Sequence, residues 1–217
     1  MIYVIGCAPS GEFTPNQTEI IKSCGLVIVK TALMEGYSNI KKLAPRHITL
    51  DGIYKKSRNF DTLNKNIVKQ VSDSHKEYKD IAYLISGSGY EDSSVMLLKS
   101  KFKDLTILPT QTKVSQLLCQ FPSTSYTIFS AFDFINESRL AFSKSFPLII
   151  YEISDNLTAG GVKLKLLKHY KEETTVYCTE NGKTIKIPLY QIDRLSSYNE
   201  QTCLLLPPQK LLEQKRF

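Results

Sequence analysis

The most constraining feature of the sequence is a set of apolar segments that each end in a loop of small residues. Three of them lie in the first half of the chain, at 2–5, 81–85 and 105–108. Continuous apolar runs of this length are typical of parallel strands that are buried on both faces. A helical pattern follows each loop, and this alternation of strands and helices predicts a mainly parallel sheet covered by helices.

The residues that flank the first helical pattern indicate where that helix begins and ends. Thr14 is a preferred N-cap residue and Pro15 suits the first helical turn, so we expect a helix over 16–24. Gly25 ends this helix, and the apolar residues that follow it form the next strand. The first thirty residues therefore predict one complete strand–loop–helix–strand unit.

The second half of the chain follows a different pattern. Residues 121–125 (Phe-Pro-Ser-Thr-Ser) are rich in turn formers, which is typical of a domain boundary. Beyond them the expected elements are a helix over 157–170, a turn at Asn181-Gly182, and strands over 147–153, 174–178, 183–187 and 202–206. The sequence thus predicts an N-terminal α/β domain at 1–120 and a C-terminal α/β domain with a mixed sheet at 126–217.

Aromatic residues gather just after this boundary, at Tyr126, Phe129, Phe132 and Phe134. Such rings line the sites of flat ligands, and they also pack between domains. We expect packing between the two domains, with ligand contact as the alternative.

Composition excludes several classes of protein. No apolar run approaches the roughly 20 residues that a membrane-spanning helix needs, and the first residues lack the basic start of a signal peptide. The five cysteines are far apart and form no Cys-x-x-Cys motif, so no metal site is predicted. An odd number of cysteines without a secretion signal favours reduced thiols and a cytoplasmic location.

The net charge of +7 raises the question of an anionic partner. The 28 basic residues are mostly lysines and are interleaved with 21 acidic ones. Since the chain has neither an arginine cluster nor an RNA-binding aromatic motif, nucleic-acid binding is not favoured. The charge is equally compatible with attraction of a small anionic substrate.

The three loops are the best candidates for a binding site. In an open α/β sheet, the loops at the carboxyl ends of the strands meet where ligands bind. Small residues let the backbone approach a ligand closely, and helix starts offer N–H donors. The first loop, at 6–11, matches neither Gly-x-Gly-x-x-Gly nor the P-loop, so a nucleotide-like pocket and plain tight turns both remain open.

Several motifs carry a resemblance over almost the whole chain. Val-Ile-Gly-Cys-Ala-Pro-Ser at 4–10 stands in place of a strand and Gly-x-Gly-Pro-Gly, Ser-Gly-Ser-Gly at 86–89 in place of Ser/Gly-Gly-Asp-Pro, and Pro-Thr-Gln-Thr at 109–112 in place of Pro-Gly-x-Ser/Thr. In these features the chain resembles the tetrapyrrole (corrin/porphyrin) methylases. The segment Ile-Pro-Leu-Tyr-Gln-Ile-Asp-Arg at 187–194 is most similar to the methylase-like N-terminal domain of MazG-type pyrophosphohydrolase fusions. The length leaves no room for the pyrophosphohydrolase part.

The resemblance implies a methyltransferase of two α/β domains that uses S-adenosylmethionine and forms a homodimer. It places the cofactor in a cleft between the domains, with a tetrapyrrole or an unknown nucleophile as the methyl acceptor. The cofactor-binding residues that it implies are Gly6, Ala8, Pro9, Ser10, Gly87, Ser88, Gly89, Tyr90, Thr112, Tyr151 and Glu152. No catalytic residue is assigned, because a sulfonium already activates the methyl group and the protein mainly aligns the reactants.

The loops also depart from the family pattern. Ala8, Ser10 and Thr110 stand where glycines are expected, and Ser88-Gly89 stand in place of Asp-Pro. The extra side-chain atoms narrow a pocket built for glycine. The alternative function is therefore a non-catalytic ligand-binding or regulatory domain with the same fold.

Overall fold

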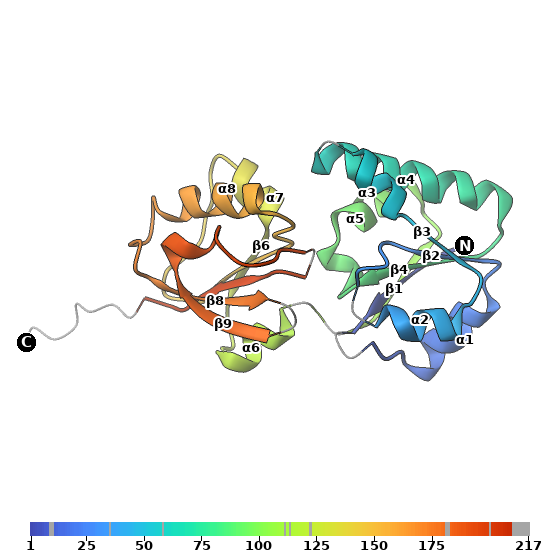
Figure 1. The fold of residues 1–217 in the computed structure, drawn as a ribbon, viewed down its shortest axis with the longest axis horizontal. Coiled ribbons are helices and arrows are strands. Elements are labelled where there is room, and N and C mark those ends of the chain that lie inside the picture. Colours follow the sequence, from blue (N-terminus) through green and yellow to red (C-terminus); the bar gives the residue numbers. More distant parts are fainter. Residues whose placement is uncertain are drawn as a thin grey trace, which may run out of the picture. The chain divides into compact units, whose positions relative to one another are not determined.

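The computed structural model describes residues 1–8, 11–34, 36–57, 59–110, 112, 114–121, 123–180, 183–199 and 201–209. The chain divides into two compact units, Met1–Thr112 and Lys113–Phe217, each with its own sheet (Figure 1). Among the described helices, none combines the length and the apolar character that crossing a membrane requires.

The first unit is built on a parallel sheet, as the sequence predicts. Its described strands are β1 (Ile2–Cys7), β2 (Leu26–Val29), β3 (His47–Thr49), β4 (Ile81–Ser86) and β5 (Leu105–Leu108). They lie in the order β3-β2-β4-β1-β5, and each neighbouring pair is parallel. The strand β1 therefore lies between β4 and β5, which come much later in the chain.

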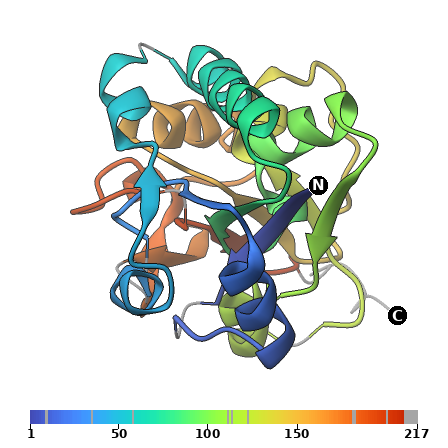
Figure 2. The same ribbon diagram turned by 90° about the vertical axis from the view of Figure 1, so that its right-hand side faces the viewer.

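Helices cover both faces of this sheet (Figure 2). Those described are α1 (Pro15–Ser23), α2 (Tyr37–Leu43), α3 (Asp51–Lys56), α4 (Phe60–Glu77), the short 3₁₀ helix η1 (Gly89–Glu91) and α5 (Ser93–Lys101). Apolar residues of α4 and α5, such as Ile67 and Leu98, pack on one face, and Ile21 of α1 and Ile40 of α2 pack on the other. The strands are buried between these layers, which is why they read as continuous apolar runs.

The second unit contains a mixed sheet. Its described strands are β6 (Thr127–Ser130), β7 (Leu148–Tyr151), β8 (Thr175–Glu180), β9 (Lys183–Pro188) and β10 (Leu204–Leu206), in the order β6-β7-β10-β8-β9. The pair β6–β7 is parallel and the other pairs are antiparallel. The helices α7 (Ala131–Asn136) and α8 (Asn156–Leu166), with the 3₁₀ helix η2 (Leu189–Gln191), pack on one face. The predicted turn at Asn181-Gly182 lies outside the described residues.

The helix α6 (Ser115–Gln120) packs on the other face of this second sheet. Leu117 of α6 and its N-cap residue Val114 belong to the same apolar cluster as Ile149 and Leu205. The division of the chain therefore falls before α6, whereas the sequence places the boundary after it, at 121–125. The apolar face of α6 accounts for the difference, because burying it joins the helix to the second core.

The aromatic stretch after α6 contributes mainly to the second unit itself. Phe134 is fully buried in the core of this unit, and its ring centroid lies 5.8 Å from that of Phe129. Tyr126 and Phe132 are exposed. Packing within the second unit thus accounts for Phe129 and Phe134, because this stretch forms β6 and α7, two short elements that the sequence did not predict.

Candidate functional site

Three strand ends meet at the carboxyl edge of the first sheet. The register pairs Gly6 with Ile85, Cys7 with Ser86, and Ile5 with Leu108. The loops that follow β1, β4 and β5 therefore start side by side. This arrangement confirms the part of the sequence analysis that places the small-residue loops at one edge of a parallel sheet.

Gly6 lets the three strand ends approach one another closely. A Cβ atom at Gly6 would lie 1.9 Å from the carbonyl oxygen of Gly87 and 2.2 Å from Cγ2 of Thr110. The Thr110 hydroxyl donates to the Gly6 carbonyl over 3.3 Å, and the Gly87 N–H donates to the Cys7 carbonyl over 3.0 Å. Only glycine fits at position 6, because any side chain would separate these loops.

The second loop is rigid and satisfies much of its own backbone. Gly87 has a φ of 70°, in the left-handed region that favours glycine. Ser88 and Glu91 form a capping box, in which the Ser88 N–H donates to the Glu91 carboxylate over 3.2 Å. The Tyr90 N–H donates to the Ser88 hydroxyl over 3.4 Å. The N–H groups that the sequence analysis offers to a ligand are thus used inside the loop at these positions.

The exposure of this loop is uneven. Gly87, Ser88 and Gly89 are buried, whereas the side chain of Tyr90 is 60% exposed, with the Lys99 Nζ atom 5.1 Å from its ring centroid. A Cβ atom at Gly89 would lie 2.6 Å from Cγ2 of Ile107 on β5. Tyr90 is therefore the part of the second loop that is open to contact from outside.

The first loop packs against the connection between β2 and α2. Within it the Gly11 N–H donates to the Ala8 carbonyl over 2.8 Å; the predicted Pro9 and Ser10 lie outside the described residues. Gly11 has a φ of 74°, and a Cβ atom there would lie 2.5 Å from the Cα atom of Gly36. The Asn39 side-chain amide donates to the Gly11 carbonyl over 3.1 Å. The sequence analysis missed this second loop-to-loop contact, since Gly36 is remote in the chain.

The remaining predicted residues fall at the end of the first unit and in the second. Thr112 is partly buried and ends the first unit. Tyr151, also partly buried, ends β7, and Glu152 follows it with 4% of its surface exposed. Glu152 has a φ of 63°. A buried carboxylate in this strained conformation is a feature that often marks a functional position.

An acidic residue, Asp51, lies at the carboxyl edge of the first sheet. The Asp51 carboxylate accepts hydrogen bonds from the Thr31 hydroxyl (2.6 Å) and from the Ala32 N–H (3.1 Å). Burial raises the pKa of Asp51, but the hydrogen bonds from Thr31, Ala32 and Thr49 and the charge of Lys55 together lower it below 3.8. Asp51 is not among the residues that the resemblance implies, and Asp-Gly in a sequence is also typical of a turn.

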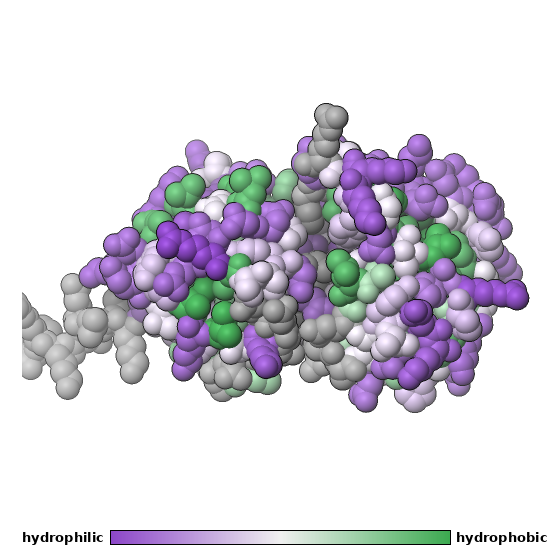
Figure 3. Space-filling view, in the orientation of Figure 1, coloured by the Kyte–Doolittle hydropathy of each residue, from purple (hydrophilic) through white to green (hydrophobic). Residues whose placement is uncertain are grey.

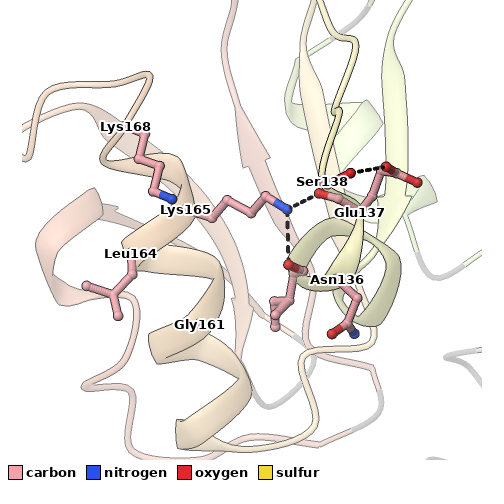
Figure 4. A pocket seen from close by; sticks show the side chains of 8 residues that line it. Asn136, Glu137, Ser138, Gly161, Leu164, Lys165 and Lys168 are labelled. Atoms are coloured by element: carbon pink, nitrogen blue, oxygen red, sulfur yellow. Dashed lines mark hydrogen bonds between the residues drawn. The ribbon is translucent and has the colours of Figure 1, made fainter.

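An open pocket lies in the second unit between α7 and α8 (Figure 4). It has a volume of about 340 Å³, and none of the predicted site residues lines it. The Lys165 ammonium group donates to the carbonyls of Ile135 (3.0 Å) and Glu137, so it caps the C-terminal end of α7. In the described part of the chain, no cluster of three or more His, Cys, Asp or Glu side chains could hold a metal ion.

The amino-acid sequence is similar to that of a curated protein. The protein YabN of Bacillus subtilis (strain 168), described as uncharacterized, is 25% identical over 219 residues. The match covers 95% of this chain but only 44% of YabN, so the chain spans less than half the length of this curated relative. No family model matches.

Solved structures show the same fold. The uroporphyrin-III C-methyltransferase of Thermus thermophilus has a TM-score of 0.63 at 14% identity, covering 95% of this chain and 94% of that one. The cobalt precorrin-4 methyltransferase CbiF of cobalamin biosynthesis has a TM-score of 0.57 at 13% identity, with 95% and 94% covered. A third structure, the Thermus enzyme in complex with S-adenosylhomocysteine, has a TM-score of 0.59 at 13% identity, with 95% and 91% covered. The chain therefore has the two-domain α/β fold of the tetrapyrrole methylases.

Proposed function

We propose that the chain is a methyltransferase that binds S-adenosylmethionine at the carboxyl edge of its first sheet. The observation that carries this proposal is the close contact of Gly6, at the end of β1, with the backbone of Gly87 after β4 and with the side chain of Thr110 after β5. In an open α/β sheet this edge is where nucleotide-like ligands bind. The likeness in fold to methyltransferases, one of them in complex with S-adenosylhomocysteine, supports the choice of ligand.

The residues proposed to hold the cofactor fall into two groups. The loop residues of the first unit would contact the adenosyl part through backbone, short side chains and the Tyr90 ring: Gly6, Ala8, Pro9, Ser10, Gly87, Ser88, Gly89, Tyr90 and Thr112. In the second unit the residues proposed for cofactor binding are Tyr151 and Glu152, and the strained, buried Glu152 supports a binding role.

The chemistry asked of the protein is modest. S-adenosylmethionine supplies a methyl group that its sulfonium already activates. The chain's own residues would therefore bind, orient and exclude water, and the rigid second loop suits that task because it loses little freedom on binding. We propose a tetrapyrrole as the acceptor, since the two enzymes of the same fold described above are named for such substrates.

Calorimetric titration tests the cofactor directly. We expect wild-type protein to bind both S-adenosylmethionine and S-adenosylhomocysteine with a stoichiometry of about one per chain, as one such edge per sheet implies. Absence of heat for both ligands would contradict the proposal. It would favour the alternative, a non-catalytic domain. The contact of Thr110 with Gly6 supports that alternative, because the threonine methyl group fills space beside the glycine.

A pair of tyrosine variants locates the binding site. Tyr90 is exposed on the second loop, so Tyr90→Ala should fold normally and bind S-adenosylhomocysteine about tenfold more weakly, the loss expected for one aromatic contact. Tyr78→Ala is the matched control, because Tyr78 is also exposed but follows α4, before β4 begins at the opposite edge of the sheet. Equal affinities for the two variants would place the ligand elsewhere.

We also propose that the protein is a cytoplasmic homodimer. None of its five cysteines, all in the described part of the chain, forms a disulfide, which supports a reducing compartment. Exposed apolar residues on α8, Leu157 and Leu164, support an association surface (Figure 3). Light scattering should give twice the chain mass of 24.6 kDa, and a monomer at all concentrations would refute the dimer.

The proposed kinship with the methylase-like domain of MazG-type fusions concerns the wider context of the chain. The greater length of YabN is compatible with a further domain in such relatives. A copurifying or genetically linked pyrophosphohydrolase would support that context.

A further inference from the structure

A buried ion pair lies at the carboxyl edge of the first sheet, outside the set of residues assigned to the cofactor. Lys30 directly follows β2, and its Nζ atom lies 2.7 Å from Oδ2 of Asp92. The two side chains are 2% and 0% exposed. Removing two charges from water is costly, and apolar residues often replace such pairs without loss of stability. Stability alone therefore does not account for this pair.

The second oxygen of Asp92 is also fully engaged. Asp92 is the N-cap of α5, and its Oδ1 atom accepts from the Ser94 N–H (3.0 Å), the Ser94 hydroxyl (2.6 Å) and the Val95 N–H (3.3 Å). The Ser94 hydroxyl in turn lies 3.0 Å from the Tyr83 hydroxyl on β4. One carboxylate thus joins the end of β2, the start of α5 and the middle of β4.

The contacts of Asp92 hold the C-terminal end of the loop from Gly87 to Tyr90, which is proposed to bind the cofactor. Asp92 directly follows η1, which contains Gly89 and Tyr90. The other end of the loop is held where the Gly87 N–H donates to the Cys7 carbonyl, and the capping box of Ser88 and Glu91 stiffens the part between. Loss of the ion pair would free the C-terminal anchor while the N-terminal anchor stays in place.

We propose that the Lys30–Asp92 pair positions the loop from Gly87 to Tyr90 for the adenosyl ligand, with Lys30 as a positioning residue that does not itself touch the ligand. The inference rests on the proposed function, because it assigns a binding role to that loop. It adds that affinity depends on a charge pair behind the loop as well as on the loop residues.

The test separates positioning from plain stabilisation. Lys30→Met or Asp92→Asn alone changes one member of a buried pair, whereas the double variant Lys30→Met/Asp92→Asn leaves no buried charge and retains a good N-cap in asparagine. We expect the double variant to melt close to wild type and yet to bind S-adenosylhomocysteine about tenfold more weakly. Backbone amides at 87–91 should also exchange hydrogen faster than in wild type, because local opening becomes easier.

The matched control is the exposed pair on α4. Lys65 and Asp61 lie 2.7 Å apart on the surface of α4, so Lys65→Met/Asp61→Asn removes an ion pair without touching the loop. This control should retain wild-type affinity and loop exchange. If the buried double variant is poorly folded, Lys30→Met alone serves as the second variant, because the Asp92 carboxylate keeps its hydrogen bonds to Ser94 and Val95 at the start of α5.

Two results would overturn the inference. One is a folded double variant with wild-type affinity and wild-type exchange at 87–91, which would make the pair a structural contact only. The other result concerns hydrogen exchange in the absence of ligand. If wild-type protein binds no S-adenosylhomocysteine, the proposed function fails, but exchange at 87–91 can still be compared between wild type and double variant. Equal exchange in the two proteins would show that the pair does not hold the loop.

Discussion

At the scale of single residues, the glycines at the strand ends serve packing before they serve a ligand. The Cβ position of Gly6 is occupied by the backbone of Gly87 and the methyl group of Thr110. Gly87 adopts a left-handed conformation that most residues avoid. Small residues at these positions thus have a structural reason that holds whether or not a cofactor binds.

A glycine pair tests this packing argument. Gly6→Ala should lower the free energy of unfolding by about 1–3 kcal/mol, because the new methyl group meets backbone that cannot move aside. Gly52→Ala, in α3, meets no atom within 4 Å and should raise it by about 0.5–1 kcal/mol through a less flexible unfolded chain. Urea unfolding measures both, and a neutral Gly6→Ala would show that the strand ends are looser than described.

Asp51 gives a prediction on pH. Its pKa is lower in the folded protein than its ordinary value of 3.8, so its contribution to stability is present above that pH and is lost as the pH falls further. Asp51→Asn should cost no more than about 1 kcal/mol at pH 7, because solvent screens this partly exposed carboxylate, and the difference should shrink below pH 3.8. Unfolding curves of both proteins across this range check it; a difference that does not change with pH would contradict it.

Sequence predicts some of these residues and cannot predict others. The loop glycines are recognisable because Gly6 and Gly87 each follow an apolar run. The Lys30–Asp92 pair is not, because the two residues are 62 positions apart and only the order β2-β4-β1 brings them together. A lysine directly after an apolar strand was the one local signal for it.

At the scale of helices and strands, prediction succeeds where burial is strong. The limits of β5 agree with the strand predicted at 105–108, because a short apolar run marks it clearly. The short elements β6 and α7 were missed, since four and six residues are too few to show a period. The helix expected over 157–170 ends at Leu166 as α8, and it is followed by turns at 167–169 and a bend at Tyr170.

The helix α6 provides a test at this scale. Leu117 is fully buried in the apolar cluster between α6 and the second sheet, so Leu117→Ala should destabilise the protein by about 2–5 kcal/mol. Hydrogen exchange should increase mainly in β7 and β10, which supply Ile149 and Leu205 to that cluster. Leu33→Ala, at a position 89% exposed, should change stability by less than about 0.5 kcal/mol. Faster exchange confined to the first sheet would contradict the assignment of α6 to the second unit.

At the scale of the whole molecule, fold and function rest on different evidence. Alternating strand and helix patterns suffice to predict the parallel sheet and the mixed sheet, because the apolar residues of each strand indicate that it is buried. The same patterns do not predict which ligand binds, since ligand choice depends on a few loop atoms that differ among proteins of one fold. The substitutions at Ala8, Ser88 and Thr110 fall on those loops, where a change can alter ligand choice while the fold is kept.

Hydrogen exchange with and without saturating S-adenosylhomocysteine tests the central claim most directly. If the three strand ends form one adenosyl site, the ligand should slow exchange together in the segments 5–8, 86–91 and 108–112, while the pocket between α7 and α8 stays unchanged. An unchanged pattern, or protection confined to that pocket, would contradict the account.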